Sequence, residues 1–129
     1  MSARAISIFL GLLLLAAGVL GFVPGQYQQN IVTPGGVFDV DTAHNIVHLV
    51  TGLLLILLPS IIGGRQTLLL LGVIYAGVAA LPYLNDGDKF LINNQYIAMN
   101  QNDRWLHIAV AAVLILAGLV FSNRVHDDD

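Results

Sequence analysis

The chain has 129 residues, of which 57% are hydrophobic and only 10% are charged, whereas a soluble domain carries about 25% charged residues. A soluble protein of this size could not bury so much apolar surface. The chain contains no cysteine, which excludes disulfides, thiolate metal sites and a cysteine nucleophile. The sequence also lacks a basic patch, so nucleic acid is not expected as a partner. The composition indicates a protein whose main partner is the lipid bilayer.

Four apolar stretches follow one another along the chain. A helix needs about 20 mostly apolar residues to cross the hydrocarbon core of a bilayer. The first stretch is longer than the apolar core of a secretory signal, so we expect it to be retained as a span. The sequence predicts an all-α fold, a four-transmembrane-helix bundle formed by a single domain (1–129), with a short acidic tail at 122–129. The predicted spans are residues 5–23, 42–62, 67–84 and 103–121.

The basic residues predict the orientation of the chain, because Lys and Arg in short loops favour the cytoplasmic side. With four spans, the two termini and the loop between the second and third spans share one side. That side carries three of the five basic residues, namely Arg4, Arg65 and Arg124. This bias predicts a multi-pass protein of a bacterial inner (plasma) membrane with both termini in the cytoplasm. The two longer loops, about 25–41 and 85–102, then face outward.

Four of the five Tyr and Trp side chains, Tyr27, Tyr83, Tyr96 and Trp105, fall near the predicted span ends on the outward side, where such residues anchor helices in the membrane interface. Tyr75 is the exception, because it lies in the middle of the third span. A buried tyrosine hydroxyl usually finds a hydrogen-bond partner. We therefore expect Tyr75 to form a hydrogen bond with a neighbouring helix.

The two halves of the chain resemble each other. When His48 is aligned with His107, His44 falls on Asp103 and Gly52 falls on Ala111. This indicates two tandem helical hairpins related by a pseudo-twofold axis along the membrane normal. The repeat would place His48 and His107 at the same depth in the membrane.

Ionisable side chains gather at the outward ends of the second and fourth spans. His44 and His48 share one face of the second span, and Asp103 and His107 share one face of the fourth, because residues four apart are neighbours on a helix. Ionisable groups within a membrane normally face the bundle interior or water. We therefore expect the two faces to lie opposite each other, and this polar cluster is the candidate site.

Three interpretations of the cluster stay open at this point. It is a purely structural polar network, or a binding site, or a device for pH sensing or proton handling, since histidine titrates near neutral pH. As a metal site, His44, His48, Asp103 and His107 make an acceptable set of ligands for a divalent metal. As a cofactor site, His48 and His107 would ligate one haem from opposite sides.

The remaining features favour a non-enzymatic protein. The loops carry no set of nucleophile and base, so no catalytic residue is predicted. Small residues on the helix faces suit close helix packing: Gly11, Gly18, Gly21, Gly72, Gly77 and Gly118. The leading functional hypothesis is an accessory or scaffold subunit that packs against itself or against a larger membrane complex. Metal or haem binding and pH sensing are the alternatives.

The most distinctive segment is Asp41-Thr-Ala-His-Asn-Ile-Val-His-Leu-Val-Thr-Gly52, preceded by Gly-Val-Leu-Gly-Phe-Val-Pro-Gly at 18–25. With these segments the chain resembles an uncharacterised family of small bacterial four-helix membrane proteins. That family has Phe-x-Pro after a glycine-rich first helix and Asn-x-x-His-x-x-x-Gly in the second, which Asn45, His48 and Gly52 match. The resemblance implies a fold and a membrane location, and it brings no established reaction.

Overall fold

The computed structural model describes residues 1–22, 41–84, 89–92, 95–98 and 101–123, and most of them lie in four long helices. The 3-10 helix η1 (Leu58–Ser60) directly continues the second of them. Counted in this way, all four helices are long and apolar enough to cross a membrane. The predicted all-α bundle of four transmembrane helices is confirmed. In chain order the helices are α1 (Ala3–Gly21), α3 (Thr42–Leu57), α4 (Gly64–Leu84) and α5 (Gln101–Val120).

The helix ends fall near the predicted span ends, and local capping explains where the helices start. The Ser2 hydroxyl accepts a hydrogen bond from the Ala5 backbone N–H at 3.2 Å, so α1 begins at Ala3. The Asp41 carboxylate accepts one from the His44 backbone N–H at 2.8 Å, which starts α3. Both residues satisfy N–H groups that have no partner inside the helix. The predicted loop 25–41 and the acidic end of the tail lie almost wholly outside the described residues.

Helix α3 ends at Leu57, earlier than the predicted span, because Pro59 lies in the following turn. Proline has no backbone N–H, so it cannot bond to the carbonyl four residues earlier, which belongs to Leu55. The Ser7 hydroxyl on α1 donates to that buried carbonyl oxygen at 2.6 Å. One serine of α1 therefore satisfies the group that the proline leaves without its usual donor.

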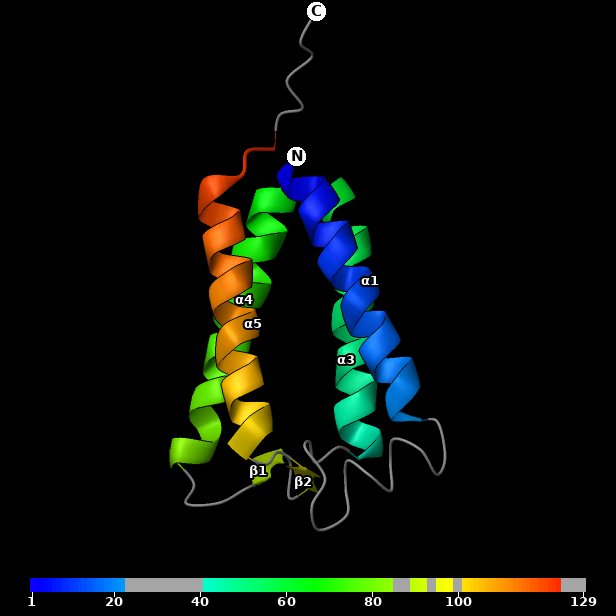
Figure 1. The fold of residues 1–129 in the computed structure, drawn as a ribbon, viewed down its shortest axis with the longest axis vertical. Helices are drawn as coiled ribbons and strands as arrows, with labels where there is room; N and C mark the ends of the chain where they lie inside the picture. The colour runs from blue at the N-terminus through cyan, green and yellow to red at the C-terminus, as the bar shows by residue number, and fades with distance from the viewer. Residues whose placement is uncertain (23–40, 85–88, 93–94, 99–100, 124–129) are drawn as a thin grey trace, which may run out of the picture.

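The helices pair in chain order, α1 with α3 and α4 with α5, as Figure 1 shows. In the first pair the backbones come very close. A Cβ atom at Gly11 would lie 2.7 Å from the Gly52 carbonyl oxygen, and one at Gly52 would lie 2.8 Å from the Gly11 carbonyl oxygen. Only glycine fits at this contact, because the obstacle is backbone on both sides. The pairing agrees with the two tandem hairpins expected from the sequence.

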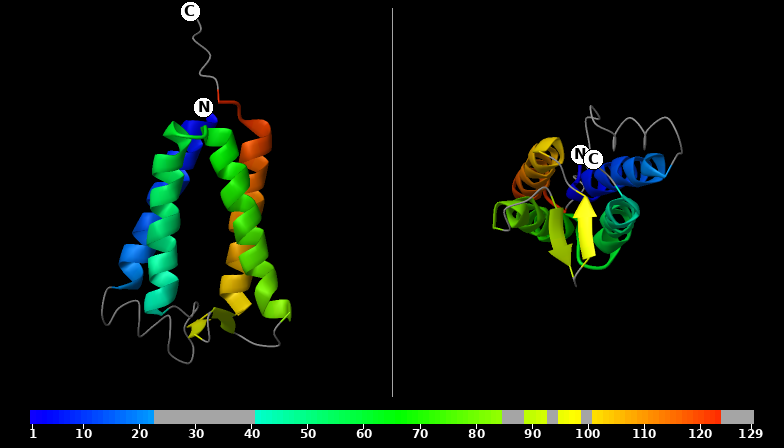
Figure 2. Two further views of the ribbon diagram at one scale, coloured as in Figure 1. Left: turned by 180° about the vertical axis from the view of Figure 1, so that it is seen from behind. Right: turned by 90° about the horizontal axis from the view of Figure 1, so that it is seen from below.

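The two hairpins meet at one end of the molecule and diverge toward the other (Figures 1 and 2). At the joined end, where α1 and α4 begin, Gly64 lies directly against the backbone of Ala3 and Arg4. The Ala3 N–H donates to the Ser122 carbonyl at 2.9 Å, and the Arg65 N–H donates to Asn123 Oδ1 at 2.7 Å. The opposite end, where α3 and α5 begin, is called the splayed end below.

A short antiparallel β-hairpin lies at the splayed end, formed by β1 (Lys89–Ile92) and β2 (Gln95–Ala98). The sequence predicts only a loop over 85–102. Two short runs that contain Phe, Ile and Tyr favour strands, and two residues separate them, which is the usual length of a hairpin connection. Strand β1 contacts α4 and strand β2 contacts α3, and Figure 2 shows the strands crossing between the two helix pairs.

The Gly11–Gly52 contact should make the first hairpin sensitive to a single methyl group. Gly11→Ala should lower the free energy of unfolding by about 1–3 kcal/mol, because the added Cβ meets backbone that cannot move aside. Gly77→Ala is the matched control, since a Cβ there meets nothing within 4 Å. Unfolding in mixed detergent, followed by circular dichroism, measures both. Equal effects at the two glycines would contradict the close contact.

The Ser7 hydroxyl should stabilise the end of α3. Ser7→Ala leaves the buried Leu55 carbonyl without this donor and should cost about 1–3 kcal/mol. Ser60→Ala removes a hydrogen bond of the same length, from Ser60 Oγ to the Leu57 carbonyl, at an exposed position. That control should change stability by less than about 0.5 kcal/mol, because water replaces the lost donor. The same unfolding assay decides, and a larger loss in Ser60→Ala would contradict the interpretation.

Candidate functional site

The polar faces of α3 and α5 both point into the molecule, as expected. On α3 the buried residues near the splayed end include His44, Asn45 and His48. On α5 they include Asp103 and His107. His48 and His107 each lie six residues after the first residue of their helix, about 9 Å along the axis at 1.5 Å per residue. The two side chains therefore lie at similar distances from the splayed end.

Three histidines from the two hairpins converge at this end. The ring centroids of His44 and His48 are 4.6 Å apart, those of His44 and His107 are 5.5 Å apart, and those of His48 and His107 are 6.0 Å apart. One nitrogen from each ring lies within 4.8 Å of the other two. These three residues are called the imidazole cluster below. It is the part of the predicted site that the structure brings together.

The backbones of α3 and α5 stay apart. In the described part of the chain the two helices do not pack along their lengths, since each packs mainly against its own hairpin partner. The face of α3 that carries Gly52 turns toward Gly11 of α1 and not toward α5. The two polar faces therefore meet through side chains, the histidines among them, and not by close packing of the helix backbones.

A hydrogen bond within α5 orients the His107 ring. Its Nδ1 lies 2.6 Å from the Asp103 backbone carbonyl oxygen, and a carbonyl can only accept, so Nδ1 carries the proton. In the neutral ring this leaves the lone pair of Nε2 for a ligand. Metal-binding histidines commonly donate their second nitrogen to a backbone carbonyl in this way.

Asp103 contributes differently from the other predicted ligands. Its side chain is 2% exposed. Among the described residues, however, the potential ligand atoms that lie close together come from the three histidines and not from the Asp103 carboxylate. Its main-chain oxygen is the acceptor for His107. Helical spacing placed Asp103 on the correct face, and direct metal ligation by its carboxylate stays a prediction.

His48 lies in the cluster without a hydrogen bond in the described part of the chain. Its ring is 9% exposed and meets the other two imidazoles edge-on or at a tilt. Its polar neighbours in the described part of the chain are therefore the two other imidazoles of the cluster.

Tyr75 of α4 adds a side chain to the site that was not predicted from the sequence to belong there. Its ring stacks on His107, with centroids 5.6 Å apart and an angle of 17° between the planes. The side chain is 3% exposed. Its hydroxyl interacts with Thr51 on the neighbouring helix α3, as expected from the sequence, although the two groups are not in strict hydrogen-bond geometry. The position of Tyr75 in the middle of a span already marked it as unusual in the sequence. Its contact with His107 could be identified only from the three-dimensional structure.

Arg104 lies next to the candidate site, on α5. Its side chain is largely buried, and its guanidinium carbon lies 5.3 Å from the centroid of the Tyr83 ring, within the range of a cation–π interaction. This contact links α5 to the end of α4 near the cluster.

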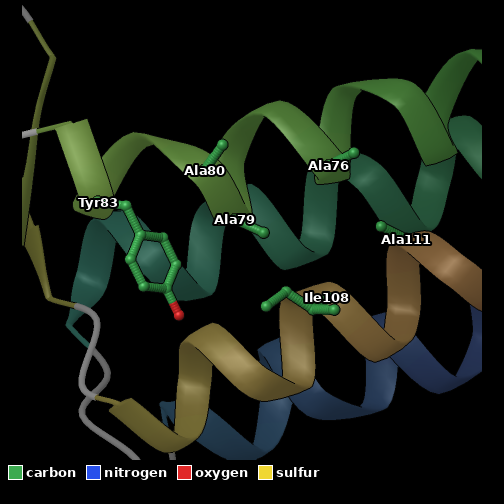
Figure 3. Close-up of a pocket in the computed structure, with 6 residues that line it drawn as sticks. All are labelled: Ala76, Ala79, Ala80, Tyr83, Ile108 and Ala111. Atoms are coloured by element: carbon green, nitrogen blue, oxygen red, sulfur yellow. The ribbon is translucent and has the colours of Figure 1, made fainter.

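An apolar groove of about 290 Å³ runs between α4 and α5, and Figure 3 shows Tyr83 reaching across it from α4 toward α5. Its lining is almost entirely hydrocarbon, so it offers a surface for packing and no chemistry of its own. The lining residues are Ala76, Ala79, Ala80, Tyr83, Ile108 and Ala111.

A family model described as a domain of unknown function (DUF4383) matches residues 4–120. The chain belongs to this family, and the match extends over all four helices. No curated protein and no solved structure matches the chain. The function therefore has to be inferred from the geometry of the site.

The approach of α3 to α5 can be tested by cross-linking, because the native chain has no cysteine. We expect a short bis-thiosulfonate to bridge the variant His48→Cys/His107→Cys, since the two native rings are neighbours. His48→Cys/Ile108→Cys is the control, because Ile108 lines the groove between α4 and α5. Intact mass distinguishes one bridge from two separate adducts. Equal bridging in both variants would show that the two hairpins are arranged differently.

Proposed function

We propose that this member of the DUF4383 family is a membrane protein that binds one divalent transition-metal ion through His44, His48 and His107. The observation that carries the proposal is the convergence of three ring nitrogens, from two separate hairpins, within 4.8 Å of one another. Neutral imidazole is a common metal ligand and suits zinc, copper, nickel and iron.

The spacing is close to what an ion needs. Metal–nitrogen bonds of about 2.0–2.1 Å in a tetrahedral site place the ligand nitrogens roughly 3.4 Å apart. A limit of 4.8 Å between the cluster nitrogens therefore requires an inward shift of about 1.4 Å at most, which side-chain rotation can supply. The Nδ1–H of His107 already donates to a carbonyl, so that ring needs no change of tautomer.

The close approach of the three imidazole rings argues against haem. A macrocycle held by His48 and His107 must lie between their rings, which are 6.0 Å apart. The His44 ring lies 4.6 Å from one of them and 5.5 Å from the other. It therefore occupies space that the plane of the haem would need. A single ion fits the three rings together, whereas haem requires His44 to leave.

The scaffold hypothesis loses part of its support. That hypothesis depended on helix faces lined with small residues that would remain exposed for packing against a partner protein. Most of those glycines pack inside the bundle, where a Cβ would meet a neighbouring helix: Gly11, Gly18, Gly21, Gly72 and Gly118. Gly77 is the one with open space around it. The orientation predicted from the basic residues would place the proposed metal site at the outward face of the membrane.

Metal binding can be measured on the full chain in mild detergent. We expect one equivalent of Zn²⁺ or Cu²⁺ per chain by elemental analysis. His48→Ala or His107→Ala should weaken binding about 100-fold or more, because loss of even an outer hydrogen-bond partner costs 10–100-fold. His126→Ala is the matched control, since it removes the remaining histidine of the chain and should leave the affinity unchanged.

Two results would overturn the proposal. A Soret band that is lost in His48→Ala would show haem instead of a single ion. A protein that takes up no metal and remains in a larger membrane complex would favour the scaffold hypothesis.

A further inference from the structure

We propose that the ion in the imidazole cluster keeps one open coordination position, which takes a small anionic or hydroxide-like ligand held by a hydrogen bond from the Tyr75 hydroxyl. This inference rests on the proposed metal site and adds the class of its ligand.

The number of metal ligands that the protein supplies leaves one coordination position of the ion open. The described part of the chain brings three ligand atoms together, all from neutral imidazoles. Tetrahedral sites with three protein ligands hold water or substrate in the fourth position, whereas structural sites supply all four ligands from the protein. The cluster therefore matches the open type of site.

The charge of the site favours an anion in that position. Three neutral imidazoles carry no charge to balance that of a divalent ion, and a net charge within a membrane bundle is costly. The Asp103 carboxylate is buried on the same helix face but stands outside the group of ligand atoms. A ligand with one negative charge, such as hydroxide, would reduce the net charge directly at the ion.

Tyr75 is placed to hold such a ligand. Its ring lies flat against His107 of α5, and its hydroxyl end lies beside Thr51 of α3. Thr51 follows His48 by about one helical turn on the same buried face. The hydroxyl is therefore on the membrane-interior side of the cluster, between the two helices that supply the imidazoles.

The hydroxyl oxygen of Tyr75 interacts with Thr51, but the hydroxyl proton has no acceptor in good hydrogen-bond geometry among the described residues. Tyr75 is 97% buried by its exposed fraction of 3%. The neighbouring Thr51 hydroxyl donates to the Val47 carbonyl at 2.8 Å, so its own proton is already engaged. A buried hydroxyl in this state is stabilised by an acceptor, and an anion on the ion is a strong one.

Azide is a suitable probe, because it binds open positions on Cu²⁺ and produces a new charge-transfer absorption band. The experiment uses the full chain in mild detergent, loaded with one equivalent of Cu²⁺ and titrated with azide. We expect saturable appearance of the band in the native protein. Tyr75→Phe should weaken azide binding ten-fold or more while the affinity for Cu²⁺ stays the same, because only the hydrogen bond to the bound anion is lost.

Tyr83→Phe is the matched control. It removes the same hydroxyl group from a half-exposed tyrosine on α4 that stacks with Arg104 and lines the apolar groove. Azide affinity in this variant should equal that of the native protein. If loss of a tyrosine hydroxyl disturbed folding in general, both variants would bind less metal per chain. A specific role of Tyr75 would instead lower only the azide affinity of Tyr75→Phe.

The outcomes separate this inference from the proposed function. If Cu²⁺ binds stoichiometrically and azide produces no band, the site is closed and only the open position is refuted. Equal azide affinity in native protein and Tyr75→Phe refutes the role of Tyr75. A tyrosinate-to-copper band without azide, lost in Tyr75→Phe, would show direct ligation in place of hydrogen bonding. If no metal binds at all, the proposed function fails as well.

Discussion

A bilayer offers no hydrogen-bond partner to a polar side chain in its hydrocarbon core, and this constraint determines how the four helices are arranged. Each of α3 and α5 carries polar residues along one face, and both faces turn inward. The apolar surfaces of the helices remain outward, where large hydrophobic side chains such as Phe9, Val73 and Leu116 are exposed. The histidines meet because neither hairpin can bury its polar face alone.

The packing of the hairpins explains why the cluster lies at one end. Close backbone contacts hold the helices together within the first hairpin and at the joined end, where Gly64 lies against the start of α1. Toward the splayed end the two hairpins diverge (Figure 1), and long side chains span the space that backbones do not. Imidazole and phenol rings have the length to do this. The proposed ion would thus connect two hairpins that are otherwise joined mainly at the opposite end.

Much of this arrangement could be predicted from the sequence. Span length and hydropathy predicted four helices, and the spacing of His44 and His48 placed both on one buried face. The alignment of His48 with His107 indicated their similar depth. The β-hairpin was not predicted, because short apolar runs within a polar loop are ambiguous in a single sequence.

Other features could not be predicted because they depend on which helix faces which. Helical spacing cannot tell that Gly52 packs against α1 while His48, one turn away, reaches toward α5. It places Asp103 on the correct face but does not give the direction of its carboxylate. The link from Pro59 to Ser7 joins residues far apart in the chain, and it exists only because α1 lies beside the missing hydrogen bond.

The depth of the cluster is consistent with its proposed role. The cost of a charge within a membrane rises toward the centre of the bilayer and is reduced near the interface. His48 and His107 lie about two helical turns from the start of α3 and α5, and the more polar residues of both helices precede them. Tyr75 lies on the interior side, where the surroundings are more apolar and a hydrogen bond to an anion is stronger. An ion held here would therefore lie near the polar end of the helices, with a dry hydrogen-bond donor at its base. This arrangement favours binding of one small ligand while the metal stays bound.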